Sequence, residues 1–124
     1  MNLLRLISGS ISAIAVTETW LTVDTQDLYH IPGYTFLTNT RINKTGGGVG
    51  FFINNQLDFA ERVNLCRMNS FIECLFVNIV LPSIGQFKVL LGCVYRPPNA
   101  DINLFNSEIV NLLEIIDNEK EVWF

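Results

Sequence analysis

Apolar residues occur in this chain mainly as short runs separated by polar or glycine-rich segments, a pattern typical of β-strands. Residues 11–17 are apolar or small at almost every position, as in a strand of a sheet that is covered on both faces. Pro82 and Gly85 mark a turn between the two longest runs, which predicts a hairpin. The predicted strands span residues 11–17, 34–38, 49–53, 59–65, 71–81 and 87–95.

A helix is predicted after the last of these strands, where apolar residues recur at intervals of three and four. Asp101 or Asn103 can cap it, and acidic side chains lie on its other face. A helix end at residues 3–7 and another strand beginning at residues 122–124 are also predicted. This order of elements favours an α/β sandwich over a doubly wound sheet. The predicted apolar face of the long helix comprises Phe105, Ile109, Leu112, Leu113 and Ile116.

The composition narrows the class of protein. The 124 residues can form one domain or part of a larger one, and 49% of them are hydrophobic. No run of 18 uncharged residues occurs, so no membrane span is predicted. Residues 1–16 are apolar but lack a convincing cleavage site, so we interpret them as structure, with a signal peptide as the rival. Cys66, Cys74 and Cys93 lie on apolar segments, which predicts buried free thiols in a reducing compartment.

The net charge of −4 is unevenly distributed. Residues 101–124 contain six acids and one lysine, a charge of −5, which is typical of a solvated helix face. Residues 1–100 contain six acids and seven bases, a charge of +1. A local basic groove for nucleic acid is therefore compatible with the composition.

Glu18 is the residue with the most informative position. It follows the apolar strand at residues 11–17, and an unpaired buried carboxylate is costly. An acid at the mouth of a strand is a place where Mg²⁺ is often held, although capping or an arginine partner would also satisfy it. A second polar signal, from Tyr95 to Asn99, closes another apolar strand. Together the two signals suggest a metal-dependent phosphodiesterase.

Four motifs occur in an order that resembles one protein family. They are Thr17-Glu18-Thr19-Trp20-Leu21, Ile31-Pro32-Gly33-Tyr34, Arg41 ahead of Gly46-Gly47-Gly48-Val49, and Val94-Tyr95-Arg96-Pro97-Pro98-Asn99. The chain resembles the endonuclease/exonuclease/phosphatase superfamily, specifically the apurinic-type endonuclease domain of non-LTR retrotransposons. The resemblance implies part of a four-layered α/β sandwich with two mixed, mainly antiparallel sheets. A phosphatase or repair nuclease of the same superfamily is the runner-up.

The resemblance implies roles for individual residues. Glu18 matches the glutamate that binds Mg²⁺ or Mn²⁺, Tyr95 the tyrosine near the scissile phosphate, and Asn99 the asparagine that closes that loop. The alternatives are that Tyr95 only ends a strand and that Asn99 caps the next helix.

Three basic residues, Arg41, Lys44 and Arg96, are candidates for contacts to the DNA backbone, which position a duplex without reading its sequence. Trp20 is expected to pack in the core or against a loop. Glu73 lies in an apolar strand and is expected to face outward, with no assigned role.

The chain also departs from the family pattern. The family's first strand, its Gly-Asp-Phe-Asn motif and its Ser/Thr-Asp-His ending have no counterpart, and His30 does not match the catalytic histidine. We therefore expect residues 1–124 to be a single incomplete domain that lacks its first strand and its C-terminal catalytic half. Such a chain would not cleave DNA alone.

The expected parent is an intracellular, nuclear polyprotein. In such a parent, the endonuclease domain precedes a reverse transcriptase and nicks DNA in the presence of Mg²⁺. A non-catalytic remnant, or a partial reading frame of that domain, is the alternative from a different functional class.

Overall fold

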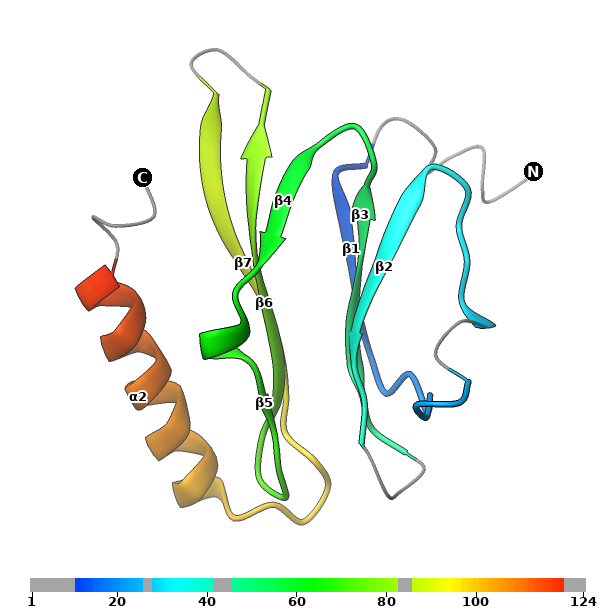
Figure 1. The fold of residues 1–124 in the computed structure, drawn as a ribbon. Helices are drawn as coiled ribbons and strands as arrows, with labels where there is room; N and C mark the ends of the chain where they lie inside the picture. Colours follow the sequence, from blue (N-terminus) through cyan, green and yellow to red (C-terminus); the bar gives the residue numbers. More distant parts are fainter. Residues whose placement is uncertain (1–10, 26–27, 42–45, 83–85, 120–124) are drawn as a thin grey trace.

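A computed structural model describes residues 11–25, 28–41, 46–82 and 86–119 (Figure 1). The expected helix end at 3–7, Lys44, the hairpin residues 83–85 and the expected strand at 122–124 lie outside this part. In chain order the elements are β1 (Ala13–Thr17), β2 (Tyr34–Asn39), β3 (Val49–Asn54), β4 (Asp58–Glu61), the 3₁₀-helix η2 (Val63–Leu65), β5 (Arg67–Met68), β6 (Glu73–Leu81), β7 (Phe87–Tyr95) and α2 (Ile102–Glu119).

The strands form two sheets. Sheet A has the order β1-β3-β2, and in sheet B the strands β4, β5 and β7 all pair with β6. Every pairing among the described strands is antiparallel. The predicted hairpin is confirmed as a strand pair, because Leu81 lies opposite Phe87 and the register continues to Glu73 opposite Tyr95.

The main core lies between the two sheets. Side chains alternate along a strand, so Leu75, Val77 and Ile79 of β6 point to the same side. They form one buried cluster with Val49, Phe51 and Ile53 of β3 and with Cys93 of β7. Burying a Val, Leu, Ile or Phe side chain contributes about 1.5–3 kcal/mol, so this cluster stabilises the packing of the two sheets.

Helix α2 covers the other face of sheet B. Asp101 caps its first turn, since Asp101 Oδ1 accepts from Asn103 N at 2.8 Å and from Leu104 N at 3.3 Å. The predicted apolar face is correct except at Leu113, which is 59% exposed, because the buried stripe is centred on Leu112 and turns the next residue outward. The side chains on the helix side of sheet B are Leu65, Ile72, Cys74, Phe71, Phe76 and Leu90, packed against Phe105, Ile109, Leu112, Ile115 and Ile116.

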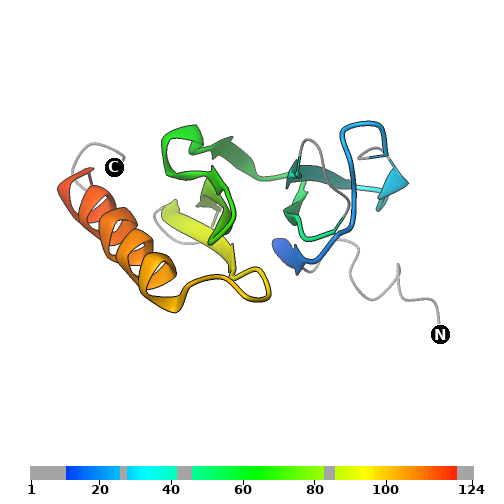
Figure 2. The ribbon, with the colours of Figure 1, turned by 90° about the horizontal axis from the view of Figure 1, so that it is seen from below.

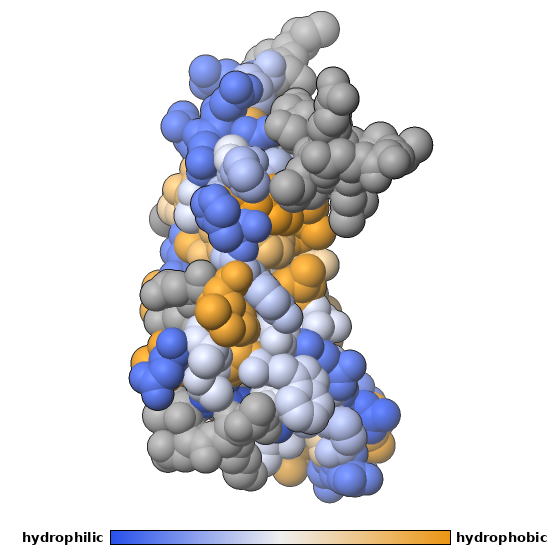
Figure 3. All heavy atoms as spheres, turned by 90° about the vertical axis from the view of Figure 1, so that its right-hand side faces the viewer, coloured by the Kyte–Doolittle hydropathy of each residue, from blue (hydrophilic) through white to orange (hydrophobic). Residues whose placement is uncertain are grey.

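The described residues form three layers, which are sheet A, sheet B and α2 (Figure 2). The predicted α/β sandwich is confirmed to this extent, and a fourth layer is not seen in the described part. On the outer side of sheet A, apolar atoms are visible between hydrophilic regions (Figure 3). Within the described ranges, no helix is long and apolar enough to cross a membrane.

Three strand predictions were too long. The strand predicted at 11–17 begins at Ala13. The strand predicted at 59–65 ends at Glu61, after which the chain turns into η2. The strand predicted at 71–81 begins at Glu73, because Asn69 Oδ1 accepts from Phe71 N and Ile72 N and holds the preceding residues in a turn. The short strand β5 before this turn was not predicted.

The three cysteines are free thiols, as predicted. Cys74 and Cys93 are buried, and Cys66 is partly exposed. Burial raises the pKa of all three thiols, and it raises the pKa of Cys74 to about 11. The raised pKa values favour the protonated thiol over the reactive thiolate at neutral pH.

Candidate functional site

Chain segments from both sheets meet at one end of the sandwich, the lower end in Figure 1. In sheet A, the last residue of β1, Thr17, and the last residue of β2, Asn39, both lie opposite Val49. In sheet B, β6 begins at Glu73 directly opposite Tyr95, where β7 ends. The motifs singled out in the sequence around Glu18, the glycine turn and Tyr95 are therefore neighbours in space.

Glu18 and Tyr95 are in direct contact. The Tyr95 hydroxyl donates to Glu18 Oε1 over 2.7 Å, across the space between the sheets. Tyr95 lies two residues after buried Cys93 on β7, so the two side chains share a face of the strand and point toward sheet A. The hydrogen bond from Tyr95 to Glu18 is the main cause that raises the pKa of Tyr95, and partial burial and nearby negative charge add to it. At neutral pH Tyr95 is thus a neutral hydroxyl donor, and the Glu18 side chain that accepts from it is exposed.

The backbone around Glu18 is unusual. Glu18 has φ +52° and Trp20 has φ +58°, both in the left-handed region that non-glycine residues rarely adopt. Trp20 N donates to Gly47 O at 2.9 Å, and Thr19 N donates to Gly48 O at 3.4 Å. The expectation that Trp20 is packed was wrong, because this turn directs its ring outward and leaves it 62% exposed.

Glu73 is not an outward-facing residue, contrary to the prediction. It is 0% exposed, and Arg41 Nε lies 2.6 Å from its Oε2. Its other oxygen, Oε1, accepts from Gly48 N at 2.7 Å. The sequence did indicate this burial, because Glu73 lies two residues before Leu75 and so shares the inner face of β6 with it. Arg41, proposed to contact DNA, thus directs part of its guanidinium into the protein.

The loop after β7 carries the other predicted residues. Arg96 is exposed, and its Nη1 donates to Ala100 O at 3.4 Å, while Ala100 N donates to Pro97 O at 3.1 Å. Asn99 is exposed and has φ +66°. The helix cap is Asp101, so the alternative in which Asn99 caps the helix is wrong.

A shallow open hollow of about 490 Å³ adjoins Glu18. It lies on the outer side of β1 and β3, the side shown in Figure 3. The Tyr29 ring meets Phe36 edge to face at 5.8 Å, and its hydroxyl donates to Thr19 O at 3.1 Å. His30, which does not match the family's catalytic histidine, lines the same hollow as Glu18, the candidate metal ligand. The lining residues are Val16, Thr17, Glu18, Thr19, Leu28, Tyr29, His30, Ile31 and Phe52.

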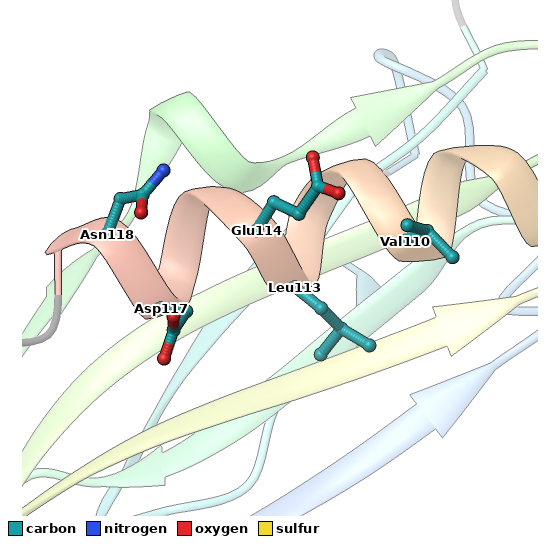
Figure 4. Close-up of a pocket in the computed structure, with 5 residues that line it drawn as sticks. All are labelled: Val110, Leu113, Glu114, Asp117 and Asn118. Atoms are coloured by element: carbon teal, nitrogen blue, oxygen red, sulfur yellow. The ribbon is translucent and has the colours of Figure 1, made fainter.

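A second hollow, of about 440 Å³, lies along α2 (Figure 4). It is lined by Val110, Leu113, Glu114, Asp117 and Asn118. Two of these five side chains are acidic and none is basic, so this surface repels a phosphate. The helix also lies on the opposite side of sheet B from sheet A, away from Glu18. We therefore exclude it from the candidate site.

The donor set at Glu18 fits a weakly held divalent cation. Mg²⁺ commonly binds proteins through one or two carboxylates and keeps several waters. Glu18 provides one exposed carboxylate, and within the described ranges its Oε2 forms no hydrogen bond. No cluster of three or more His, Cys, Asp or Glu side chains occurs in the part of the chain that the structure describes. A cation bound at Glu18 would therefore take most of its ligands from water.

No protein-family model, curated protein or solved structure matches this chain.

Proposed function

We propose that this chain carries the metal- and phosphate-binding end of a Mg²⁺-dependent DNA endonuclease domain of the non-LTR retrotransposon type. The observation that carries the proposal is the 2.7 Å contact between Tyr95 and Glu18. These residues are 77 positions apart and lie in two of the four motifs on which the resemblance rests. Their meeting at one end of a two-sheet sandwich supports the proposal that they belong to one site.

The two residues have complementary chemistry. Glu18 would hold Mg²⁺ together with waters, and the ion would offset negative charge on the phosphate and the leaving oxygen. Tyr95 supplies a neutral hydroxyl donor, which its raised pKa keeps protonated at neutral and mildly alkaline pH. A hydroxyl in this position can donate to a phosphate oxygen. The next residue, Arg96, adds an exposed positive charge for the DNA backbone.

The surface around the pair also suits a nucleic acid. Trp20 is 62% exposed two residues after Glu18, and its indole ring is a stacking surface for a base. The hollow beside Glu18 is lined mainly by apolar and aromatic side chains. Residues 101–119, which include α2, contain five acids and no lysine or arginine, and the helix lies on the other side of sheet B. Phosphate would therefore be attracted to the Arg96 end rather than to the helix.

The 124 residues contain no Gly-Asp-Phe-Asn motif to supply the activating aspartate. For this chain by itself, the proposal therefore predicts binding without turnover. Reverse transcriptase as a neighbouring domain and a nuclear location are parts of the same proposal. A nicking assay in Mg²⁺ tests whether this chain turns over DNA by itself. Nicking activity that is abolished by Glu18→Gln would show that the chain is catalytically sufficient.

The test of the proposal is cation binding. Mn²⁺ bound to the 124-residue chain can be measured by the relaxation of water protons, because bound Mn²⁺ relaxes them more strongly than free Mn²⁺. We expect one site that is lost in Glu18→Gln. The matched control is Glu114→Gln, which removes an exposed acid from the α2 hollow and should leave binding unchanged. Equal binding by the native chain and Glu18→Gln would refute the proposal.

A further inference from the structure

We propose that Arg41 and Glu73 are positioning residues for the Glu18–Tyr95 site, acting through the glycine turn at residues 46–48. This inference rests on the proposed function for its biological meaning, but it is carried by contacts that involve neither metal nor DNA. The sequence assigned Glu73 no role and assigned Arg41 to a different one. The structure places both beneath the turn that supports Glu18.

The first link in the chain of contacts is the ion pair itself. Glu73 is fully buried and uses its two carboxylate oxygens separately, one toward Arg41 Nε at 2.6 Å and the other toward Gly48 N at 2.7 Å. Arg41 lies just after β2, Gly48 just before β3, and Glu73 at the start of β6. One carboxylate thus holds both sides of the β2–β3 turn of sheet A against sheet B.

The second link joins this turn to the residues that follow Glu18. The carbonyls of Gly47 and Gly48 accept from Trp20 N and Thr19 N. Space at the contact is tight. A Cβ on Gly47 would lie 2.6 Å from both Arg41 Nη2 and Glu73 Oε1, and a Cβ on Gly48 would collide with Thr19 Oγ1. The glycines are therefore required both by their positive φ values, +61° and +91°, and by the close packing.

The third link is the conformation of Glu18. Its φ of +52° and the +58° of Trp20 are unfavourable for side-chain-bearing residues, and such conformations persist when the surrounding structure determines them. The hydrogen bonds from Thr19 N and Trp20 N to the glycine carbonyls hold the backbone in place immediately after Glu18. With the turn displaced, Glu18 would relax to an ordinary backbone conformation and its carboxylate would leave Tyr95.

The contacts of Arg41 favour this role over direct DNA binding. Its Nε is directed to Glu73, and its guanidinium lies next to Gly46 and Gly47, with Nη1 3.5 Å from the position of a Cβ on Gly46. Its side chain is 24% exposed. Glu73 balances the charge of this cation inside the protein, whereas Arg96 is exposed beside Tyr95.

The test uses two matched glycine substitutions. Gly47→Ala inserts a methyl group between Arg41 and Glu73 without changing any charge. Gly33→Ala is the control, because Gly33 also has positive φ, +85°, but a Cβ there would meet no atom within 4 Å. Both variants carry the backbone strain of a left-handed alanine, and only the first disturbs the ion pair.

Two readouts are made on the full 124-residue chain. The first is the nuclear Overhauser contact between the Tyr95 ring protons and the Glu18 side-chain protons, measured without metal. We expect it to be lost in Gly47→Ala and retained in Gly33→Ala. The second is Mn²⁺ affinity, which should fall by about 10–100-fold in Gly47→Ala only, the range seen when groups that orient metal ligands are altered.

A folded Gly47→Ala variant that keeps the Tyr95–Glu18 contact would overturn the inference. Should that variant not fold, Glu73→Asp decides the question by the same readouts, because it keeps the charge and withdraws the carboxylate from its two partners. The two proposals fail differently. If the native chain binds no Mn²⁺, the proposed function fails, and the Overhauser contact still decides whether Arg41 and Glu73 position Glu18.

Discussion

Removing the Arg41 guanidinium should destabilise the protein more than breaking an ion pair whose carboxylate is partly exposed, because Glu73 is fully buried. In Arg41→Met the aliphatic part of the side chain is retained, but Glu73 keeps a buried charge with Gly48 N as its remaining donor. Breaking a buried ion pair from one side typically costs about 3–5 kcal/mol. The Arg41 side chain is 24% exposed, so water can partly replace the lost cation. We therefore expect a loss near the lower limit, about 3 kcal/mol.

The assay is urea unfolding followed by circular dichroism, with thermal unfolding as a second measurement. For a domain of this size, about 1 kcal/mol corresponds to about 4 °C, so the midpoint should fall by about 12 °C. Glu108→Gln is the control, because it breaks the pair of Arg67 and Glu108, which are 27% and 19% exposed and 2.8 Å apart. It leaves the hydrogen bonds from Arg67 Nη1 to Asn64 O and Cys66 O in place. Loss of this less buried pair should cost about 1 kcal/mol or less.

A double variant tests the physical reason. In Arg41→Met with Glu73→Leu no charge remains buried, and replacing both members of a buried pair by apolar residues is often nearly neutral. Gly48 N then lacks an acceptor, which costs about 1 kcal/mol. The double variant should therefore be more stable than Arg41→Met alone. The reasoning would be refuted by a double variant at least as unstable as the single one, or by equal losses in Arg41→Met and Glu108→Gln.

Three further predictions concern other parts of the molecule. The hydrogen bond from Tyr95 to Glu18 stabilises the fold at pH values below the ordinary tyrosine pKa of about 10, and this contribution is lost as the pH rises through the raised pKa of Tyr95. Tyr95→Phe should therefore weaken the dependence of stability on alkaline pH. Trp20→Ala should weaken binding of a single-stranded oligonucleotide by about 1–3 kcal/mol in a fluorescence-anisotropy titration, without lowering the unfolding midpoint. Gly92→Ala should cost about 1–3 kcal/mol in urea unfolding, because its methyl group would collide with the Phe76 ring.

Local features of the fold could be predicted from the sequence. The strand at 87–95 was predicted with its observed bounds, and Asp101 was one of two predicted helix caps. Both depend on neighbours in the chain, through side-chain alternation in the first case and a hydrogen bond two residues away in the second. Leu113 was placed wrongly because helical spacing defines a stripe but not which residue of an apolar pair is at its centre.

Features that depend on contacts between the sheets were less predictable. The exposure of Trp20 follows from a left-handed turn that is held by glycine carbonyls more than 25 residues later, and no local pattern encodes that contact. Glu73 was a different case. Its parity with Leu75 placed it on the inner face, but finding its partner required knowing that Arg41 enters from the other sheet.

The two carboxylates at this end of the sandwich have opposite environments, and the difference indicates which of them is available to a cation. Glu73 is fully buried, and Arg41 already balances its charge. A metal there would have to displace a guanidinium in close contact. Glu18 is exposed, and its partner Tyr95 is a neutral donor that leaves the negative charge in place. Of the two carboxylates, Glu18 is therefore the one at which a divalent ion would gain more, and the proposed role of the buried pair is to orient it.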